Sequence, residues 1–241
     1  MKILVIGDLH GRDCWKDVID REGINKVIFI GDYCDSFDYS DIEILHNLNK
    51  IINYKLENPN KVELLIGNHE LHYIYYPNYK CSGFRPTMMH DLGHLLNKNI
   101  NLFKIAYKHD NYLFTHAGVT KKWLNKNINM LKGYGLNEDL NNIDEALNNI
   151  NETSNRWILN TYNEKRGGMR YDLGGPTWAD KSETWFDAVP NFIQVVGHTP
   201  VGGLHTNEAK QTEGEGLVYY VDCLDKYKKE NMYDYFLILD I

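Results

Sequence analysis

The sequence predicts an α/β protein in which two layers of β-sheet are flanked by helices, and three observations lead to this prediction. Short runs rich in β-branched residues alternate with helical patterns in the first third of the chain. Each of these runs ends abruptly in a glycine and a polar cluster. The last third carries further short strands without long helices between them. Alternating strands and helices are typical of parallel βαβ units, whereas the later pattern favours a second, more mixed or antiparallel sheet.

Three strands are expected in the first third, at residues 2–6, 26–30 and 61–66, with helices near 13–22 and 41–57 between them. The strands run into the sequences Gly-Asp-Leu-His-Gly, Gly-Asp-Tyr-Cys-Asp and Gly-Asn-His-Glu. In open α/β sheets, ligands bind just beyond the carboxyl ends of the strands. All three polar clusters are therefore expected at the binding edge of one sheet.

The remainder of the chain is expected to complete the same domain. Its predicted strands lie at 102–107, 112–115, 192–196, 217–221 and 233–239. The segment around 120–165 has a helical, asparagine-rich pattern and is interpreted as a helical insertion, and the glycine-rich stretch 166–180 as a long loop. Because no repeat or linker interrupts the pattern, residues 1–241 are interpreted as a single domain.

Composition narrows the class of protein. The chain has 241 residues, of which 43% are apolar and 24% charged, values typical of a globular protein. Its apolar runs fall short of the ~20 residues that span a bilayer, and the run at 2–6 is too short for a secretory signal, so a cytoplasmic protein without a membrane partner is expected. The net charge of -7 does not favour long nucleic acid as a partner. The four cysteines form no C-x-x-C pair, so neither a zinc knuckle nor a disulfide framework is expected.

Side chains of the metal-ligand or acid–base type follow five of the predicted strands. They are Asp8, His10, Asp32, Asn68, His69, His116 and His198. Taken alone, a Gly-Asp pair after a strand is usually a turn, and a single histidine is usually structural. That explanation would have to hold independently at every one of the five strand ends. We therefore interpret the clusters as parts of one site.

Carboxylate and imidazole ligands in one set indicate transition-metal ions. They suit Mn, Fe, Zn or Ni better than Mg, which is usually bound by oxygen ligands alone. A carboxylate such as Asp32 can bridge two ions. Two ions about 3.5–4 Å apart can orient a phosphoryl group and stabilise its in-line displacement. The residue types therefore favour a two-metal site that acts on a phosphate ester.

The order of these clusters resembles a known family. The series Gly-Asp-x-His-Gly, Gly-Asp-x-x-Asp, Gly-Asn-His-Glu, His-x-Gly and Gly-His-Thr extends from Asp8 to His198. It is similar to the motifs of the calcineurin-like metallophosphoesterase superfamily, most of all to the phosphoprotein phosphatase branch and its bacterial and phage relatives. The resemblance implies the metallophosphoesterase fold, with one dinuclear metal site at the carboxyl ends of the strands.

The same resemblance assigns a role to each side chain. It implies two divalent metal ions, with manganese expected and iron, zinc or nickel as alternatives. The first ion would be held by Asp8, His10 and Asp32, and the second by Asp32, Asn68, His116 and His198. His69 would protonate the leaving group from outside the coordination sphere, and Asp35 would orient His69 through a hydrogen bond.

Two arginines that bind the substrate phosphate in phosphoprotein phosphatases have no counterpart here. The first would follow Asp35, where the sequence has Ser36 and Phe37. The second would follow a segment that 175–180 faintly resembles, but no arginine occurs between that segment and residue 198. Both departures weaken the expectation of protein phosphatase specificity.

Two other arginines are candidate replacements. Arg85 is the first choice, because the Gly83-Phe84 pair before it resembles a Gly-Phe pair that borders the phosphatase cleft. Arg12, which directly follows the first motif, is the second choice. For either position, an ordinary surface arginine is the competing interpretation.

The function expected from these observations is hydrolysis of a phosphomonoester by attack of a metal-bound hydroxide, with activity like that of phosphoprotein phosphatases as one form of it. The substrate would be a phosphorylated small molecule, a nucleotide or a phosphoprotein. The missing arginines favour one alternative, a phosphodiesterase or a hydrolase of nucleotides such as dinucleoside polyphosphates. A second alternative is a non-catalytic binding module on the same scaffold, and the intact ligand set together with His69 and Asp35 argues against it.

Overall fold

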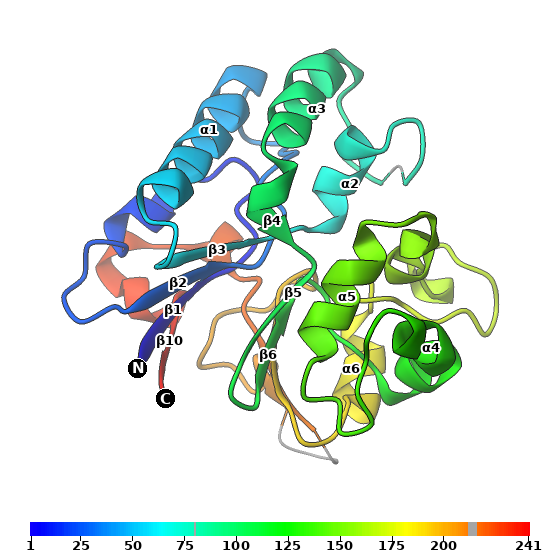
Figure 1. The fold of residues 1–241 in the computed structure, drawn as a ribbon. Coiled ribbons are helices and arrows are strands. Elements are labelled where there is room, and N and C mark those ends of the chain that lie inside the picture. Colours follow the sequence, from blue (N-terminus) through cyan, green and yellow to red (C-terminus); the bar gives the residue numbers. More distant parts are fainter. Residues whose placement is uncertain (80, 212–215) are drawn as a thin grey trace.

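The computed structural model describes residues 1–79, 81–211 and 216–241, and its described strands form two five-stranded sheets (Figure 1). The first sheet consists of β1 (Lys2–Ile6), β2 (Lys26–Phe29), β3 (Val62–Leu65), β4 (Phe103–Lys104) and β10 (Leu237–Asp240). Its order is β10-β1-β2-β3-β4, in which β1 to β4 are parallel and β10 is antiparallel to β1. The parallel arrangement brings the carboxyl ends of β1, β2 and β3 to one edge of the sheet.

The second sheet is more mixed, as the sequence pattern predicts. It consists of β5 (Ala106–His109), β6 (Tyr112–Thr115), β7 (Ile193–Val196), β8 (Lys210–Gln211) and β9 (Leu217–Tyr220), in the order β5-β6-β7-β9-β8. Strands β6, β7 and β9 are parallel, whereas β5 and β8 pair antiparallel at the two edges. The carboxyl ends of β6 and β7 therefore also meet at one edge.

Alternation along the strands builds two apolar layers. In β1, Ile3 and Val5 belong to a cluster shared with Phe114 and Val195 of the second sheet, so this layer joins the two sheets. Leu4 and Ile6 belong instead to the larger cluster beneath the helices. Successive side chains of a strand point to opposite faces, so a strand buried on both faces supplies both layers. The predicted two-layer sheet arrangement flanked by helices is confirmed.

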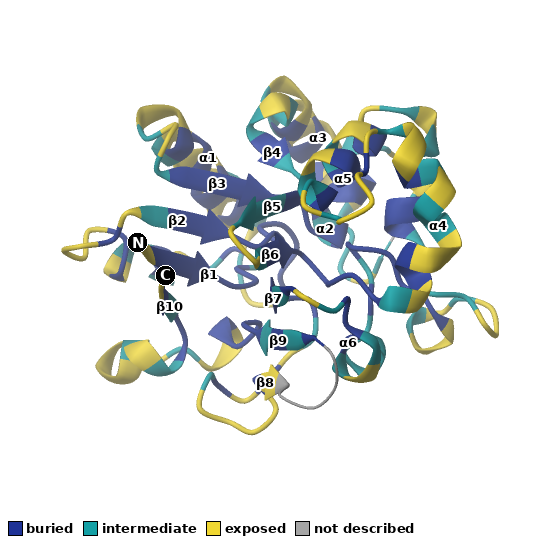
Figure 2. Ribbon diagram, turned by 60° about the horizontal axis from the view of Figure 1, so that its bottom comes forward, coloured by how far each residue is buried: buried dark blue, intermediate teal, exposed yellow. Residues whose placement is uncertain are grey.

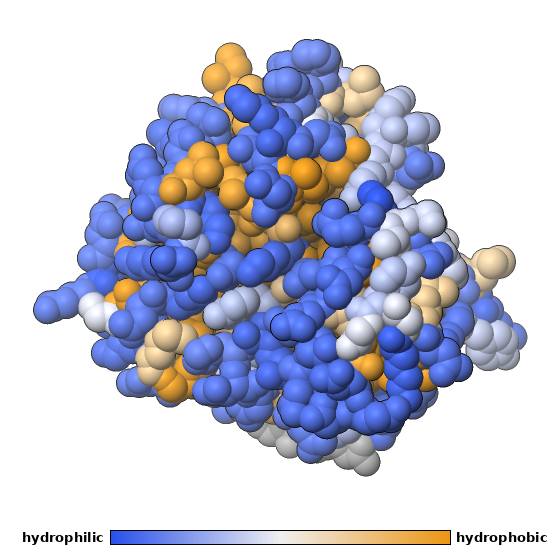
Figure 3. Space-filling view, in the orientation of Figure 1, coloured by the Kyte–Doolittle hydropathy of each residue, from blue (hydrophilic) through white to orange (hydrophobic). Residues whose placement is uncertain are grey.

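Six α-helices lie among the described residues. They are α1 (Asp41–Glu57), α2 (Asn68–Ile74), α3 (Met89–Lys98), α4 (Lys121–Gly133), α5 (Ile143–Asn151) and α6 (Lys181–Asp187). Of these, α1 lies against the first sheet and α5 against the second, whereas α2 lies beyond the end of β3 (Figure 2). Helix α1 begins in a capping box formed by Ser40 and Glu43, which satisfies backbone amides of its first turn. The face drawn in Figure 3 is mainly hydrophilic, with apolar side chains visible between the helices.

The segment expected to be a helical insertion contains α4 and α5, and the stretch 166–180 has no α-helix or strand, as predicted. The interpretation of residues 1–241 as one domain with an insertion stays a prediction. Among the described residues, no helix combines the length and the apolar character needed to cross a membrane.

Three predicted elements differ from the structure. The helix near 13–22 is wrong, because only Cys14–Asp17 forms a short 3-10 helix. Asp13 does not cap it; its carboxylate pairs with Lys16 instead, so the unfavourable first turn gains no capping stabilisation. The strand predicted at 102–107 is divided between β4 and β5, which lie in different sheets. The last strand begins at Leu237 rather than 233, and 229–234 form 3-10 turns.

Candidate active site

The polar clusters after β1, β2, β3, β6 and β7 meet at one end of the two sheets. The backbone amide of His198, after β7, donates to Asp8 Oδ2, after β1, at 2.9 Å. The approach is close enough to require glycine at Gly197, because a Cβ atom there would lie 1.9 Å from Asp8 Oδ1. A Cβ atom at Gly67 would likewise lie 2.1 Å from Asp32 Oδ1. The glycines of the motifs therefore let adjacent loops bring the carboxylates together.

Four of the predicted site residues have left-handed backbone conformations. The φ angle is 45° at His10, 52° at Asp32, 56° at Asp35 and 65° at His198. Non-glycine residues rarely adopt this region, and such strain persists only where the surrounding structure holds it in place. The concentration of strained residues at these strand ends indicates that the loops are shaped to aim particular side chains.

Asp32, Asn68, His116 and His198 form one group of converging ligand atoms. His116 Nε2 lies 2.9 Å from Asn68 Oδ1, 3.2 Å from His198 Nδ1 and 3.4 Å from Asp32 Oδ2. His116 Nδ1 is 3.1 Å from the carbonyl of Ile30, which can only accept, so Nδ1 carries the proton. A cation that displaced the proton of Nε2 would therefore find the lone pair of this nitrogen aimed at it, as in a metal ligand.

His10 and Asp32 form a second group of ligand atoms next to the first group. His10 Nδ1 donates to the carbonyls of Cys34 and Asp35, both at 2.9 Å. The other nitrogen, Nε2, therefore faces Asp32 Oδ2 at 3.8 Å with its lone pair free. Because Asp32 Oδ2 belongs to both groups, its carboxylate lies where a bridge between two ions is expected.

The charges and hydrogen bonds of the candidate ligands fit the binding of divalent cations. Asp8 Oδ1 is buried and has no hydrogen-bond partner among the described residues. Burial, and next the buried carboxylate of Asp222, raise the pKa of Asp8 well above its ordinary value. Burial lowers the pKa of His116, but the Asp32 carboxylate raises it to about 9, so the pocket attracts positive charge. A cation bound among these groups would stabilise the buried carboxylate of Asp8 and take the place of the proton on His116. Mixed carboxylate and imidazole ligands suit transition metals.

His69 lies beside His10 and Asp32, and the ligand atoms of the three residues are within 4.8 Å of one another. Its Nδ1 is 2.8 Å from Asp35 Oδ2, and its Nε2 is 3.9 Å from Asp32 Oδ2. Burial lowers the pKa of His69, but the carboxylates of Asp32 and Asp35 raise it well above the ordinary value. One ring nitrogen is thus held by a carboxylate while the other points toward the ligand cluster. This is the arrangement that a proton donor requires.

Two residues that the sequence analysis did not assign hold Asp35 from behind. His72 Nε2 lies 2.7 Å from Asp35 Oδ2, and the hydroxyl of Tyr73 donates to Asp35 Oδ1. Both follow His69 by three and four residues in α2, so the helical period places them on the same side of the helix. The spacing in the sequence could have shown that His69, His72 and Tyr73 share one side of a helix. It could not show that Asp35 lies beside that helix.

Glu70 is a second unassigned residue, and it is fully buried. Its two carboxylate oxygens accept hydrogen bonds from the backbone amides of Asp32, Tyr33, Cys34 and Gly67, at 2.9 to 3.0 Å. These amides belong to the loops that follow β2 and β3. Glu70 therefore ties together the two loops that present Asp32 and Asn68, through charge-assisted hydrogen bonds.

The sequence model of the calcineurin-like phosphoesterase family matches residues 1–237. The chain belongs to this family. It is 30% identical over 147 residues to the serine/threonine-protein phosphatase 4 catalytic subunit of Eremothecium gossypii, a match covering 59% of this chain and 41% of that protein. The chain thus spans less than half the length of the curated relative it matches.

Solved structures agree with the family at the level of the fold. The crystal structure of a cold-active protein-tyrosine phosphatase from a psychrophilic Shewanella species is 17% identical, with a TM-score of 0.51 over 99% of this chain and 75% of that one. Another structure of a cold-active protein tyrosine phosphatase is also 17% identical, with a TM-score of 0.50 over 99% of this chain and 73% of that one. At this identity the likeness shows the shared fold alone.

In this calcineurin-like phosphoesterase, a cavity of about 230 Å³ opens beside His10 and His69. Arg12 lines it, with its guanidinium 3.7 Å from the exposed carboxylate of Asp38 and 3.2 Å from the carbonyl of Leu9. Neither contact is a strong ion pair, because an exposed carboxylate at this distance binds weakly. The positively charged side chain of Arg12 therefore lies in the wall of the cavity that also contains His10 and His69.

Arg85, the first choice from the sequence, is arranged differently. Its guanidinium contacts the Asp41 carboxylate and the carbonyl of Ser36, and it donates to the carbonyl of Tyr39 at 3.0 Å. Ser36 and Tyr39 belong to the loop between β2 and α1, and Asp41 is the first residue of α1. Arg85 is not among the residues that line the cavity. Both arginines stay predictions as substrate-binding residues, and the geometry favours Arg12, because Arg85 holds this loop whereas Arg12 lines the cavity.

Arg12→Ala is expected to keep its metals and its fold while kcat/KM falls by an amount equivalent to about 2–4 kcal/mol, as when one charged or dipolar contact to the reacting group is lost. Lysine should restore only part of the loss, because it cannot make a paired contact. Arg85→Ala, the matched control, should lower thermal stability with little change in kcat/KM. Steady-state kinetics and thermal melts would check both. A catalytic loss confined to Arg85→Ala would reverse the assignment.

Proposed function

We propose that this chain is a dinuclear metal-dependent phosphatase that hydrolyses phosphomonoesters. The observation that carries the proposal is the position of His69, whose Nδ1 is held by Asp35 at 2.8 Å while Nε2 faces Asp32 at 3.9 Å. A proton donor fixed beside a metal-ligand cluster serves hydrolysis of esters with poor leaving groups, because their alkoxides must be protonated. Family membership supports the same reaction class.

Each part of the proposed site has a task that its chemistry allows. One ion would be held by Asp8, His10 and Asp32, and the other by Asp32, Asn68, His116 and His198. Two divalent ions bound there would neutralise phosphoryl oxygens and activate water. Arg12 would bind phosphoryl oxygens that face away from the ligand cluster. His69 would deliver its Nε2 proton to the leaving oxygen, while Asp35 keeps the ring oriented.

Metal removal tests this proposal directly. Prolonged chelation of the full chain should abolish hydrolysis of p-nitrophenyl phosphate, and about two equivalents of Mn²⁺ should restore it, because a two-metal site needs both ions. Metal content measured by mass spectrometry should follow activity. A phosphodiester, bis(p-nitrophenyl) phosphate, should be hydrolysed more slowly than the monoester. Full activity in chelated protein would contradict the metal requirement, and a preference for the diester would favour the phosphodiesterase alternative.

A second candidate function, hydrolysis of a nucleotide, is favoured by an aromatic cavity next to the site. The cavity has a volume of about 690 Å³, and Trp157, Tyr162 and Trp178 lie in its wall. The ring centroid of Trp178 lies 5.5 Å from that of Tyr162 and 5.5 Å from that of His198. A substrate whose phosphate binds near His198 could therefore extend a flat ring into the cavity, where aromatic faces stack well with bases.

Tyr162→Ala is expected to raise KM for nucleoside monophosphates by an amount equivalent to about 1–3 kcal/mol, the value of one stacking contact. KM for a phosphoserine peptide should change little if the cavity holds a base. Phe186→Ala removes another exposed aromatic side chain, outside the residues that line the cavity, and serves as the control. Kinetics on both substrates would decide. Equal effects of Tyr162→Ala on the two substrates would rule out specific base binding.

A further inference from the structure

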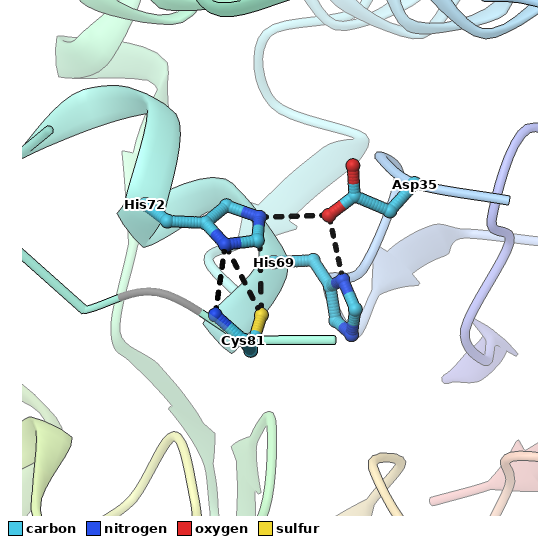
Figure 4. A group of neighbouring side chains, drawn as sticks. All are labelled: Asp35, His69, His72 and Cys81. Carbon is cyan, nitrogen blue, oxygen red and sulfur yellow. Dashed lines mark hydrogen bonds and ion pairs between the residues drawn. The ribbon is translucent and has the colours of Figure 1, made fainter. Parts of the chain in front are cut away.

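The Asp35 carboxylate accepts hydrogen bonds on both of its oxygens. Its Oδ2 atom lies 2.8 Å from His69 Nδ1 and 2.7 Å from His72 Nε2 (Figure 4). The hydroxyl of Tyr73 donates to the other oxygen, Oδ1. The three donors all belong to α2, whereas Asp35 belongs to the loop after β2. One short helix therefore binds both ends of a carboxylate that another part of the chain presents to it.

The His72 ring is held at both of its nitrogen atoms. The side chain is completely buried, and Nδ1 lies 3.2 Å from the backbone nitrogen of Cys81 and 3.2 Å from Cys81 Sγ. The other nitrogen, Nε2, faces Asp35, and a carboxylate can only accept a hydrogen bond, so Nε2 carries a proton. The charged form of the ring keeps this proton too. The donation to Asp35 therefore does not depend on the charge of His72.

The loop that contacts His72 also borders the candidate active site. Its next residues, Ser82 and Gly83, line the cavity that contains His69. The loop packs closely on the Asp35 side chain, because a Cβ atom at Gly83 would lie 3.3 Å from Asp35 Cβ. A continuous set of polar contacts thus leads from the backbone of this loop through His72 and Asp35 to His69.

We propose that His72 and Tyr73 are positioning residues for the proton donor: they fix the orientation of Asp35, which in turn keeps His69 Nε2 directed toward the leaving group. This inference rests on the proposed role of His69. The last side-chain bond of an aspartate otherwise rotates over a broad range. Hydrogen bonds to both oxygens prevent that rotation, so that Oδ2 stays opposite His69 Nδ1.

A packing role for the two side chains predicts a different pattern of effects. A residue that only stabilises the fold would lower thermal stability, and any loss of activity would be similar for every substrate. A residue that positions the proton donor matters where the leaving group needs a proton, and nitrophenolate leaves without one. Comparison of leaving groups therefore separates the two roles.

Steady-state kinetics on the Mn²⁺-loaded full chain test the inference. His72→Leu removes the donor and keeps a side chain of similar size. It should lower kcat on a phosphoserine peptide by roughly 10–100-fold with little change in KM, the loss expected for a misplaced catalytic group. On p-nitrophenyl phosphate the loss should be at most about threefold. His72→Gln should recover most of kcat, because its amide can donate to Asp35. Equal losses of His72→Leu on the two substrates would overturn the inference.

Tyr73→Phe makes a smaller change at the other oxygen of Asp35, and it keeps the inference testable if His72→Leu does not fold. It should lower kcat selectively on the phosphoserine peptide. Tyr220→Phe is the matched control, since it removes another buried hydroxyl, which lies 2.9 Å from Thr184 Oγ1. The control should leave the ratio of the two rates unchanged. An unchanged ratio in Tyr73→Phe, or the same change in Tyr220→Phe, would contradict the positioning role.

A double-mutant cycle distinguishes a failure of this inference from a failure of the proposed function. If His72 acts through His69, adding His72→Leu to His69→Asn should cause little further loss on the phosphoserine peptide, because residues that act as a unit are not additive. A full additional loss would overturn the positioning role alone. If His69→Asn itself lost rate equally on both substrates, the proton-donor role would fall, and the positioning role with it.

Discussion

Asp32→Asn is expected to lower kcat/KM by roughly 10³-fold or more and to reduce metal content at both positions of the proposed dinuclear site. Each bound ion supplies several kcal/mol of charge stabilisation to the transition state, so weakening both removes more than any single contact. The reason lies in the position of Asp32 Oδ2, which is 3.8 Å from His10 Nε2 and 3.4 Å from His116 Nε2. It is the oxygen common to both ligand groups.

The substitution preserves shape, so its effect reports on charge and coordination. The backbone amide of His69 donates to Asp32 Oδ1 at 3.1 Å, a contact that the carbonyl oxygen of asparagine can also accept. Asp20→Asn makes the same change on an exposed residue and should leave metals and activity unaltered. Metal stoichiometry, titration calorimetry with Mn²⁺ and steady-state kinetics would be measured on both. Two tightly bound ions with normal turnover in Asp32→Asn would show that this carboxylate is not the bridge.

His69→Asn is expected to retain its metals and yet lose roughly 10²–10⁴ in rate on esters with poor leaving groups, such as a phosphoserine peptide. We assign this side chain to proton donation and not to metal binding, because Asp35 holds its Nδ1 at 2.8 Å, although its Nε2 lies near His10 and 3.9 Å from Asp32. On p-nitrophenyl phosphate the loss should be much smaller, because nitrophenolate leaves without a proton. The comparison between the two substrates, rather than the size of either loss, identifies the role.

His94→Asn provides the control, since His94 is an exposed histidine on α3. It should behave as the wild type on both substrates. Metal content of His69→Asn should be measured alongside, so that a lost ion is not mistaken for a lost proton donor. If the two substrates lost rate equally while the metals stayed bound, His69 would be acting on the phosphoryl group or its binding, and the proton-donor assignment would fail.

Much of this site could be predicted from the sequence because it is built from local patterns. Each ligand cluster directly follows a strand, and parallel strands bring their carboxyl ends to one edge. Asp32, Asn68 and His116 therefore needed only the correct strands to be placed together. Helix α1 and strands β1, β2 and β3 were predicted for the same reason, since hydrophobic periods and helix caps are encoded by neighbouring residues.

The elements that were mispredicted depend on distant partners. The residues at 102–107 have one continuous β pattern, but Phe103 pairs with Leu64 in the first sheet and Ala106 pairs with Thr115 in the second. Nothing local distinguishes one strand from two that enter different sheets, because β pattern reflects burial and not the identity of the neighbour. The helix predicted near 13–22 was wrong for a related reason, since the apolar residues of this segment are buried in the core without forming an α-helix.

The types of the candidate ligands, their order and their places at strand ends can be read from the chain, because they are local properties of the sequence. What surrounds these side chains depends on the folded structure. It placed Arg12 in the cavity and bound Arg85 to the loop before α1, and it set His72 and Cys81 behind the Asp35–His69 pair. These relations join side chains that are far apart in sequence, so they are fixed by how loops pack across the sheets, which no periodicity or motif spacing encodes.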